Sequence, residues 1–166
     1  MRQRILAWTL EIHPSTTRRV YRAIRSGAAA RCGCDACRNF DAARPRHYDE
    51  RFRQILARAG VDPRKEDEVR LVTPLEGGRY LYAGRYVFCG QVLAGRPHRG
   101  FPFSTGDTDV FERISPELHV ALRRWAAPAG PWIGFPCVRL EFLVVLPWVL
   151  PDPPRRPVGL EARGST

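Results

Sequence analysis

Three of the five cysteines lie within a six-residue segment that reads CGCDAC and runs from Cys32 to Cys37. Thiolates are ligands that zinc and other soft metal ions prefer in proteins. If the chain bends at Gly33 and enters a helix at Asp35, the three sulfur atoms can face one point. The sequence therefore predicts a metal site with Cys32, Cys34 and Cys37 as ligands and zinc as the candidate ion.

The fourth ligand of such a site is not marked by the spacing. Structural zinc sites take four protein ligands, and the chain has no second Cys-x-x-Cys pair to complete a zinc ribbon. Cys89, Cys137, His47 or His98 could complete the site if the chain folds back on the cluster. The sequence leaves the choice between them open.

The same cysteines allow two other interpretations. Cys34 and Cys37 form a Cys-x-x-Cys motif at the expected start of a helix, where the helix dipole favours a thiolate, as in dithiol oxidoreductases. A thioredoxin-like site needs a βαβ context with a helix directly behind the motif, and Pro45 follows soon after it. The simplest alternative assigns no ligand, because free cysteines often act as small buried apolar residues.

No other catalytic motif stands out. The four histidines are isolated from one another, and the sequence contains no G-x-S-x-G, H-E-x-x-H or phosphate-loop pattern. The acidic run from Glu66 to Glu68 follows Arg64 and Lys65, which predicts a solvated turn with local charge pairs. We expect a non-catalytic binding or accessory domain with a protein partner. A metal- or thiol-dependent enzyme that uses the same cysteines is the alternative, so the sequence leaves catalysis open.

The chain is basic, with 27 lysine and arginine residues against 17 acidic residues and a formal net charge of +10. Such a charge can attract nucleic acid. Lys65 is the only lysine, however, and the arginines are spread over nearly every segment. This skew also fits GC-rich codon usage, so an arginine-mediated nucleic-acid binder is an alternative that we do not favour.

No segment predicts export or membrane insertion. The apolar run from Ile5 to Leu10 is too short for a signal peptide and continues into Glu11. The stretch from Val138 to Leu150 carries charges and is shorter than the roughly 20 residues that a membrane-spanning helix needs. We therefore expect a cytoplasmic protein with no membrane contact, whose thiols are reduced, metal-bound or buried.

Periodicity predicts the elements in the first half of the chain. Alternating apolar residues predict a strand over residues 4–12, and residues 17–25 fit a strand better than a short helix. The clearest helix has Pro45 near its first turn and ends before Gly60. Its apolar face has helical spacing and consists of Tyr48, Phe52, Ile55, Leu56 and Ala59.

The second half of the chain is expected to contain mostly strands. Strands are predicted around residues 69–74, 80–88 and 138–146, with a hairpin at the glycine pair 77–78. Residues 118–125 alternate as a strand would, but a helix start just before them leaves both interpretations open.

Aromatic residues share one face of segment 80–88. Arg79 and Arg85 fall on the opposite face, whereas a platform that stacks nucleic-acid bases needs its cations on the same surface. The pattern therefore favours a sheet core over a stacking platform. The aromatic residues are Tyr80, Tyr82, Tyr86 and Phe88.

Together these elements predict an α+β fold, in which a mostly antiparallel sheet packs against one main amphipathic helix. Residues 1–151 are expected to form a single globular domain that includes a long loop at residues 94–110. Residues 152–166 are rich in proline and arginine and are expected to form a flexible tail.

Four local patterns occur in order along residues 5–151. They are CDACRNF from Cys34, AGVDP from Ala59 followed by Lys65 and Glu68, YAGRYVF from Tyr82 followed by Gly90, and LPWVL from Leu146. In this order they resemble a family of small uncharacterised bacterial proteins. The resemblance implies no established activity and transfers no catalytic residue. It favours strands at residues 17–25 and 118–125.

Overall fold

The long strand β4 (Arg79–Ala94) organises the sheet, because it pairs with three other strands. Along one edge it pairs with β7 (Cys137–Pro147), and along the other with β3 (Glu68–Leu75) and then with β2 (Trp8–Ile12). The computed structural model describes residues 1–95, 111–152 and 154.

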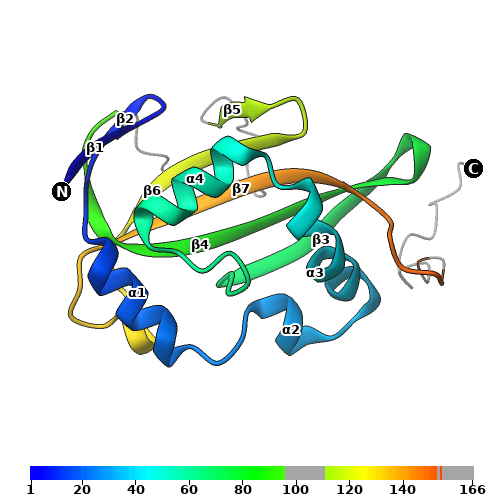
Figure 1. The fold of residues 1–166 in the computed structure, drawn as a ribbon, viewed down its shortest axis with the longest axis horizontal. Coiled ribbons are helices and arrows are strands. Elements are labelled where there is room, and N and C mark those ends of the chain that lie inside the picture. The colour runs from blue at the N-terminus through cyan, green and yellow to red at the C-terminus, as the bar shows by residue number, and fades with distance from the viewer. Residues whose placement is uncertain (96–110, 153, 155–166) are drawn as a thin grey trace, which may run out of the picture.

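All strand pairs of this sheet are antiparallel (Figure 1). The order β1-β2-β4-β7-β6-β5 places β7 in the middle, as predicted from its apolar sequence. The remaining strands are β6 (Leu118–Trp125), which pairs with β7, and the edge strands β1 (Arg2–Ile5) and β5 (Glu112–Ser115).

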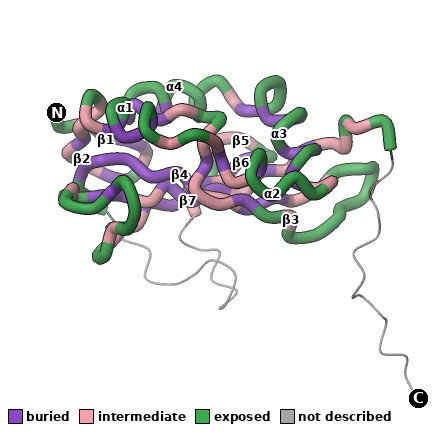
Figure 2. The backbone as a smooth tube through the Cα atoms, turned by 90° about the horizontal axis from the view of Figure 1, so that it is seen from below, coloured by how far each residue is buried: buried purple, intermediate pink, exposed green. Residues whose placement is uncertain are grey.

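The helices precede β3 in the sequence and form a second layer. Figure 1 shows α4 crossing in front of the sheet, and Figure 2 shows α3 and α4 on one side of β4 and β7. This arrangement is the predicted α+β fold. The helices are α1 (Pro14–Ala23), α2 (Ala28–Cys32), α3 (Asp35–His47) and α4 (Glu50–Ala59), and short 3-10 turns span Glu76–Gly78 and Gly130–Trp132.

Aromatic rings fill the space between the helices and the sheet. Phe142 of β7 lies at the centre, with its ring centroid 6.0 Å from those of Phe40 in α3 and Phe52 in α4 and 5.4 Å from that of Tyr86 in β4. Tyr82, Tyr86 and Phe88 are at most 1% exposed. These rings therefore form the predicted core and are not accessible for stacking with bases.

Helix α1 completes the edge of β4 where no strand pairs with it. Between the residues that pair with β3 and with β2, the Tyr21 hydroxyl donates to the carbonyl of Val87 (2.9 Å) and accepts from its amide (3.3 Å). One turn earlier, Thr17 Oγ1 accepts from the amide of Cys89 (3.0 Å). Two side chains of a helix thus satisfy backbone groups that a strand would otherwise pair.

The predicted strand at residues 17–25 is wrong, because these residues belong largely to α1. Thr17, Val20 and Tyr21 are its buried residues, and their i, i+3, i+4 spacing fits one helix face better than an alternating strand. Pro14 begins the helix, where its missing amide costs no hydrogen bond. Residues 118–125, in contrast, form strand β6.

Two other predicted elements are each divided in the structure. Residues 4–12 form a hairpin of β1 and β2 that turns at Leu6, whose φ of 54° lies in the left-handed region. The helix expected from Pro45 to Ala59 is two helices, because α3 continues through Pro45 and α4 begins only after Asp49. The Asp49 side chain caps α4 by accepting from the amide of Arg51 (2.8 Å).

Parts of two predicted segments lie outside the described residues. These are residues 96–110 of the expected loop and most of the expected tail from residue 152 onward. Among the helices that the described ranges form, none has the length and apolar character needed to cross a membrane.

Replacing Tyr21 by phenylalanine should lower the free energy of unfolding by about 1–3 kcal/mol, because both backbone groups of Val87 lose their buried partner. Urea denaturation measures this change. Tyr80→Phe is the matched control, since it removes the same hydroxyl group from a half-buried tyrosine of β4. Equal losses in the two variants would contradict the role of Tyr21 at the edge of β4.

Candidate metal centre

The three clustered cysteines meet where α2 ends and α3 begins. Gly33 ends α2 in the left-handed region with a φ of 67°, and its amide donates to the carbonyl of Ala29 (3.1 Å). Cys34 then caps α3. The Sγ atoms of Cys32, Cys34 and Cys37 all lie within 4.8 Å of one another. The predicted bend at Gly33 is confirmed, and α3 begins at Asp35, where the helix was expected.

These sulfur positions fit a tetrahedral metal ion. With Zn–S bonds of about 2.3 Å, two thiolates on one tetrahedral zinc ion lie about 3.8 Å apart. The separations of up to 4.8 Å require only small side-chain rotations to reach that value. The three cysteines can therefore hold one metal ion from a single turn of the chain.

The outer and inner thiols of the cluster differ in acidity. Hydrogen bonds from the Cys34 backbone amide, and then from the Cys34 and Cys37 thiols, lower the pKa of the exposed Cys32. Burial raises the pKa of Cys37, and its hydrogen bonds to the other two sulfur atoms raise it further. Without metal, Cys37 is thus a neutral thiol at neutral pH, so a metal ion must displace its proton.

A buried carboxylate fixes the two helices that carry the cysteines. Glu66 is 1% exposed, and its Oε1 accepts from the amide of Ala29 at the start of α2 (2.7 Å). Its Oε2 accepts from Nη1 of Arg44 in α3, which is 4% exposed. Because one side chain binds both helices, Glu66 sets the distance between Cys32 and Cys37.

Glu66 was not predicted as part of any site. The sequence predicted a solvated turn at residues 64–68, and for Glu66 this is wrong because its charge is paired with an arginine 22 positions away. Gly27, the residue before α2, also shows how closely the Glu66 side chain packs against the start of this helix. A Cβ atom on Gly27 would lie 2.6 Å from Glu66 Oε1 and from the carbonyl oxygen of Arg64, so only glycine fits.

Asn39 connects α3 to the end of the central strand. Its side chain is fully buried, and its Nδ2 donates to the carbonyl of Pro147 and to the hydroxyl of Tyr82, both at 3.1 Å. Its Oδ1 accepts from the amide of Val149 (2.7 Å). Residues of three patterns that are distant in the sequence, CDACRNF, YAGRYVF and LPWVL, therefore meet at one asparagine.

Cys89 and Cys137 do not complete the metal site. They pair directly across β4 and β7, and a hydrogen bond between their thiols lowers the pKa of Cys89 and raises that of Cys137. Tyr82 lies close to Cys37, which adds to the effect of burial in raising the pKa of Tyr82 to about 12. The seven residues from Tyr82 to Cys89 span about 23 Å of extended strand, so Cys89 lies far from Cys37 and the metal site.

The two candidate histidines also give no fourth ligand here. His47 is exposed at the opposite end of α3, about 15 Å along the helix axis from Cys37. His98 lies outside the described residues. Within the described ranges, no further histidine, cysteine, aspartate or glutamate joins the three sulfur atoms.

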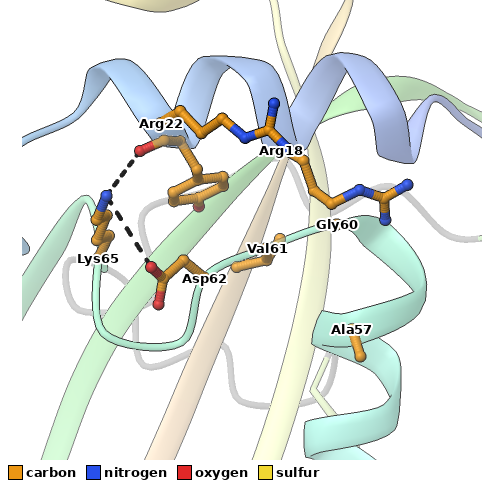
Figure 3. A pocket seen from close by; sticks show the side chains of 8 residues that line it. Arg18, Arg22, Ala57, Gly60, Val61, Asp62 and Lys65 are labelled. Atoms are coloured by element: carbon orange, nitrogen blue, oxygen red, sulfur yellow. Dashed lines mark hydrogen bonds and ion pairs between the residues drawn. The ribbon is translucent and has the colours of Figure 1, made fainter.

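The AGVDP pattern and Lys65 hold α1 against the core. Figure 3 shows Lys65 between Asp62 and the backbone of α1, where its Nζ donates to the carbonyl of Tyr21 (2.8 Å). The Tyr86 hydroxyl donates to the carbonyl of Pro63 (2.8 Å). The Lys65 contacts border a pocket of about 360 Å³. Together with the bond from Tyr86, they give the pattern a structural role.

Comparisons with known proteins identify no relative. No protein-family model matches the chain, and no curated protein or solved structure matches it at a significant level. The resemblance to a bacterial family therefore stays a prediction, and the functional argument depends on the site.

Replacing Glu66 by glutamine should destabilise the protein by at most about 3–5 kcal/mol, because the buried guanidinium of Arg44 loses its buried counter-charge and keeps only the half-exposed Asp41. Thermal or urea unfolding measures the loss. The thiol of Cys37 should also react faster with a disulfide reagent, since α2 and α3 are then held less firmly. Glu76→Gln, at an exposed turn, is the control and should change neither quantity. Unchanged Cys37 reactivity in a destabilised Glu66→Gln variant would show that Glu66 does not position the cluster.

Proposed function

We propose that this chain is a zinc-binding accessory domain, in which Cys32, Cys34 and Cys37 hold a structural zinc ion and the domain binds another protein. The observation that carries the proposal is the convergence of three sulfur atoms within 4.8 Å at the junction of α2 and α3. Three thiolates form a soft ligand set, which suits zinc better than magnesium or calcium.

The local structure gives the metal a mechanical role. Helix α2 has only five residues, too few to be stable without external contacts. Glu66 holds its first turn through the amide of Ala29. A zinc ion on Cys32 would hold its last residue to the first turn of α3, so both ends of the short helix would be fixed.

The exposed side of the cluster supports a binding role. Cys32 and Cys34 are exposed while Cys37 is buried, so the fourth coordination position would face outward. A water molecule or a side chain of a protein partner could take that position. Catalytic metal sites usually lie in a pocket. The three clustered cysteines line neither the pocket of Figure 3 nor the larger pocket between Lys65 and Trp125.

One observation favours a second candidate, a dithiol redox function. Helix α3 continues from Asp35 through Pro45 to His47, so the Cys-x-x-Cys motif is followed directly by a helix after all. The sequence argument against a redox site therefore fails on this point. Cys34 and Cys37 are also close enough to exchange between dithiol and disulfide after modest rotation.

Metal analysis of the purified protein tests the first proposal. We expect about one equivalent of zinc per chain, coordinated by three sulfur atoms and one lighter atom in X-ray absorption spectra. Each of the single substitutions Cys32→Ser, Cys34→Ser and Cys37→Ser should remove most of the zinc. Cys89→Ala, which removes a buried thiol outside the cluster, is the matched control and should retain it.

A metal-free protein with freely titrating thiols, grown and purified with zinc present, would contradict the zinc proposal. Zinc that is lost equally in Cys89→Ala would contradict the ligand assignment. A reversible disulfide between Cys34 and Cys37 in protein that binds no zinc would support the redox function instead.

Zinc affinity should rise with pH, because each bound thiolate must first lose a proton. Cys37 has a raised pKa, so protons compete with zinc for it throughout the neutral range. We expect the apparent affinity to rise roughly tenfold or more for each pH unit between about pH 6 and pH 8. Competition with a chelator of known affinity measures this, and a flat profile would exclude Cys37 as a ligand.

A further inference from the structure

A pocket of about 510 Å³ lies beside Lys65, next to the pocket of Figure 3. It is bounded by the end of α1, the segment before β3, the loop after β6 and the face of the sheet. Its volume falls within the range of sites that bind small organic molecules. Its lining has four cations, two carboxylates that are both paired with arginines, and three large aromatic rings, which are Arg31, Lys65, Arg85, Arg139, Glu66, Asp67, Tyr21, Trp125 and Trp132.

One cation of this pocket, Arg139, lies against an aromatic ring. Its guanidinium lies over the ring of Trp125, with the central carbon 4.3 Å from the ring centroid. Its Nε is buried and has no hydrogen-bond partner. No ion pair links Arg139 to a carboxylate in the described part of the chain. A buried donor without an acceptor raises the free energy of the folded protein. A bound anion could supply the acceptor that Arg139 Nε lacks.

The carboxylates near Arg139 are bound to other arginines. Asp67 accepts from Arg85 Nε (2.6 Å), and Glu141 pairs with Arg123 (3.2 Å). Burial lowers the pKa of Arg139, and the positive charges of Arg85 and Arg123 lower it further, by more than the carboxylates of Asp67 and Glu141 raise it. The guanidinium therefore faces like charges in a partly dehydrated place, which favours a bound anion.

The pocket also has a firm aromatic wall. Trp132 is 3% exposed, and its ring meets that of Tyr21 edge-on with centroids 5.3 Å apart. Trp125 is held against Arg139. Large rings fixed in this way offer apolar surface without losing much side-chain freedom when a ligand binds.

We propose that this pocket binds a small aromatic anion, whose phosphate or carboxylate group pairs with Arg139 and whose ring lies against the wall of Trp125 and Trp132. The planar guanidinium can donate two parallel hydrogen bonds to either group. The inference does not rest on the metal site, because none of the three clustered cysteines lines the pocket.

The pocket of Figure 3 is a weaker candidate for anion binding. Arg18 and Arg22 extend from α1 along its rim, but both are exposed and solvated, so no buried donor there lacks an acceptor. Arg22 thus provides a matched control for Arg139, since its removal takes the same charge from the neighbouring pocket.

Calorimetric titration with four probes tests the proposal. Phenyl phosphate and benzoate carry a ring and an anionic group, inorganic phosphate lacks the ring, and benzyl alcohol lacks the charge. We expect the better of the two ring-bearing anions to bind about tenfold or more tightly than inorganic phosphate, and benzyl alcohol not to saturate. The order of phenyl phosphate and benzoate identifies which anionic group the pocket prefers.

Variants locate the binding. Arg139→Gln should weaken the preferred ring-bearing anion about tenfold or more, whereas Arg22→Gln should leave it unchanged. Trp125→Leu should weaken the ring-bearing anions and leave inorganic phosphate unaffected. Circular dichroism melting shows that each variant is folded, and Arg139→Lys serves as a second variant that keeps the charge without the planar fork. Equal affinities in wild type and Arg139→Gln, or no saturation by either ring-bearing anion, would overturn the proposal.

Discussion

The ion pair between Glu66 and Arg44 is the interaction on which the placement of α2 against α3 depends. Both side chains are almost fully buried, and the guanidinium also lies over the ring of Phe40, 5.4 Å from its centroid. A buried charge is tolerated only when it is paired and hydrogen-bonded. The pair therefore specifies one arrangement of α2 and α3, and the positions of the clustered cysteines follow from it.

The parts of the fold that could be predicted from sequence are those encoded by neighbouring residues. The apolar periodicity of β7 and of α4 indicated their type, and the bend at Gly33 followed from a glycine between two cysteines. Residues 17–25 were predicted as a strand because a short segment with few apolar residues fits both the helical and the strand periodicity. Its Thr17 and Tyr21 are buried by an interaction with the edge of β4, which no local pattern encodes.

The candidate site was predictable only in part, for the same reason. Three candidate ligands lie within six residues, so their convergence needed only one turn of the chain. Glu66 reaches partners 37 and 22 positions away in α2 and α3, and Arg139 acquires its setting from residues on β4, β6 and the loop after β6. Helix α2 lies between the two sites, because Arg31 lines the pocket and Cys32 follows it directly in the cluster.

The way in which α1 closes the edge of β4 affects how the protein meets other chains. A run of free amide and carbonyl groups on a sheet edge is a template for strand addition and aggregation. Between Tyr86 and Cys89, β4 would present such a run, and two hydroxyl groups of one helix occupy it instead. Thr17 and Tyr21 thus close this part of the edge to strand addition, as charged residues do on exposed edge strands elsewhere.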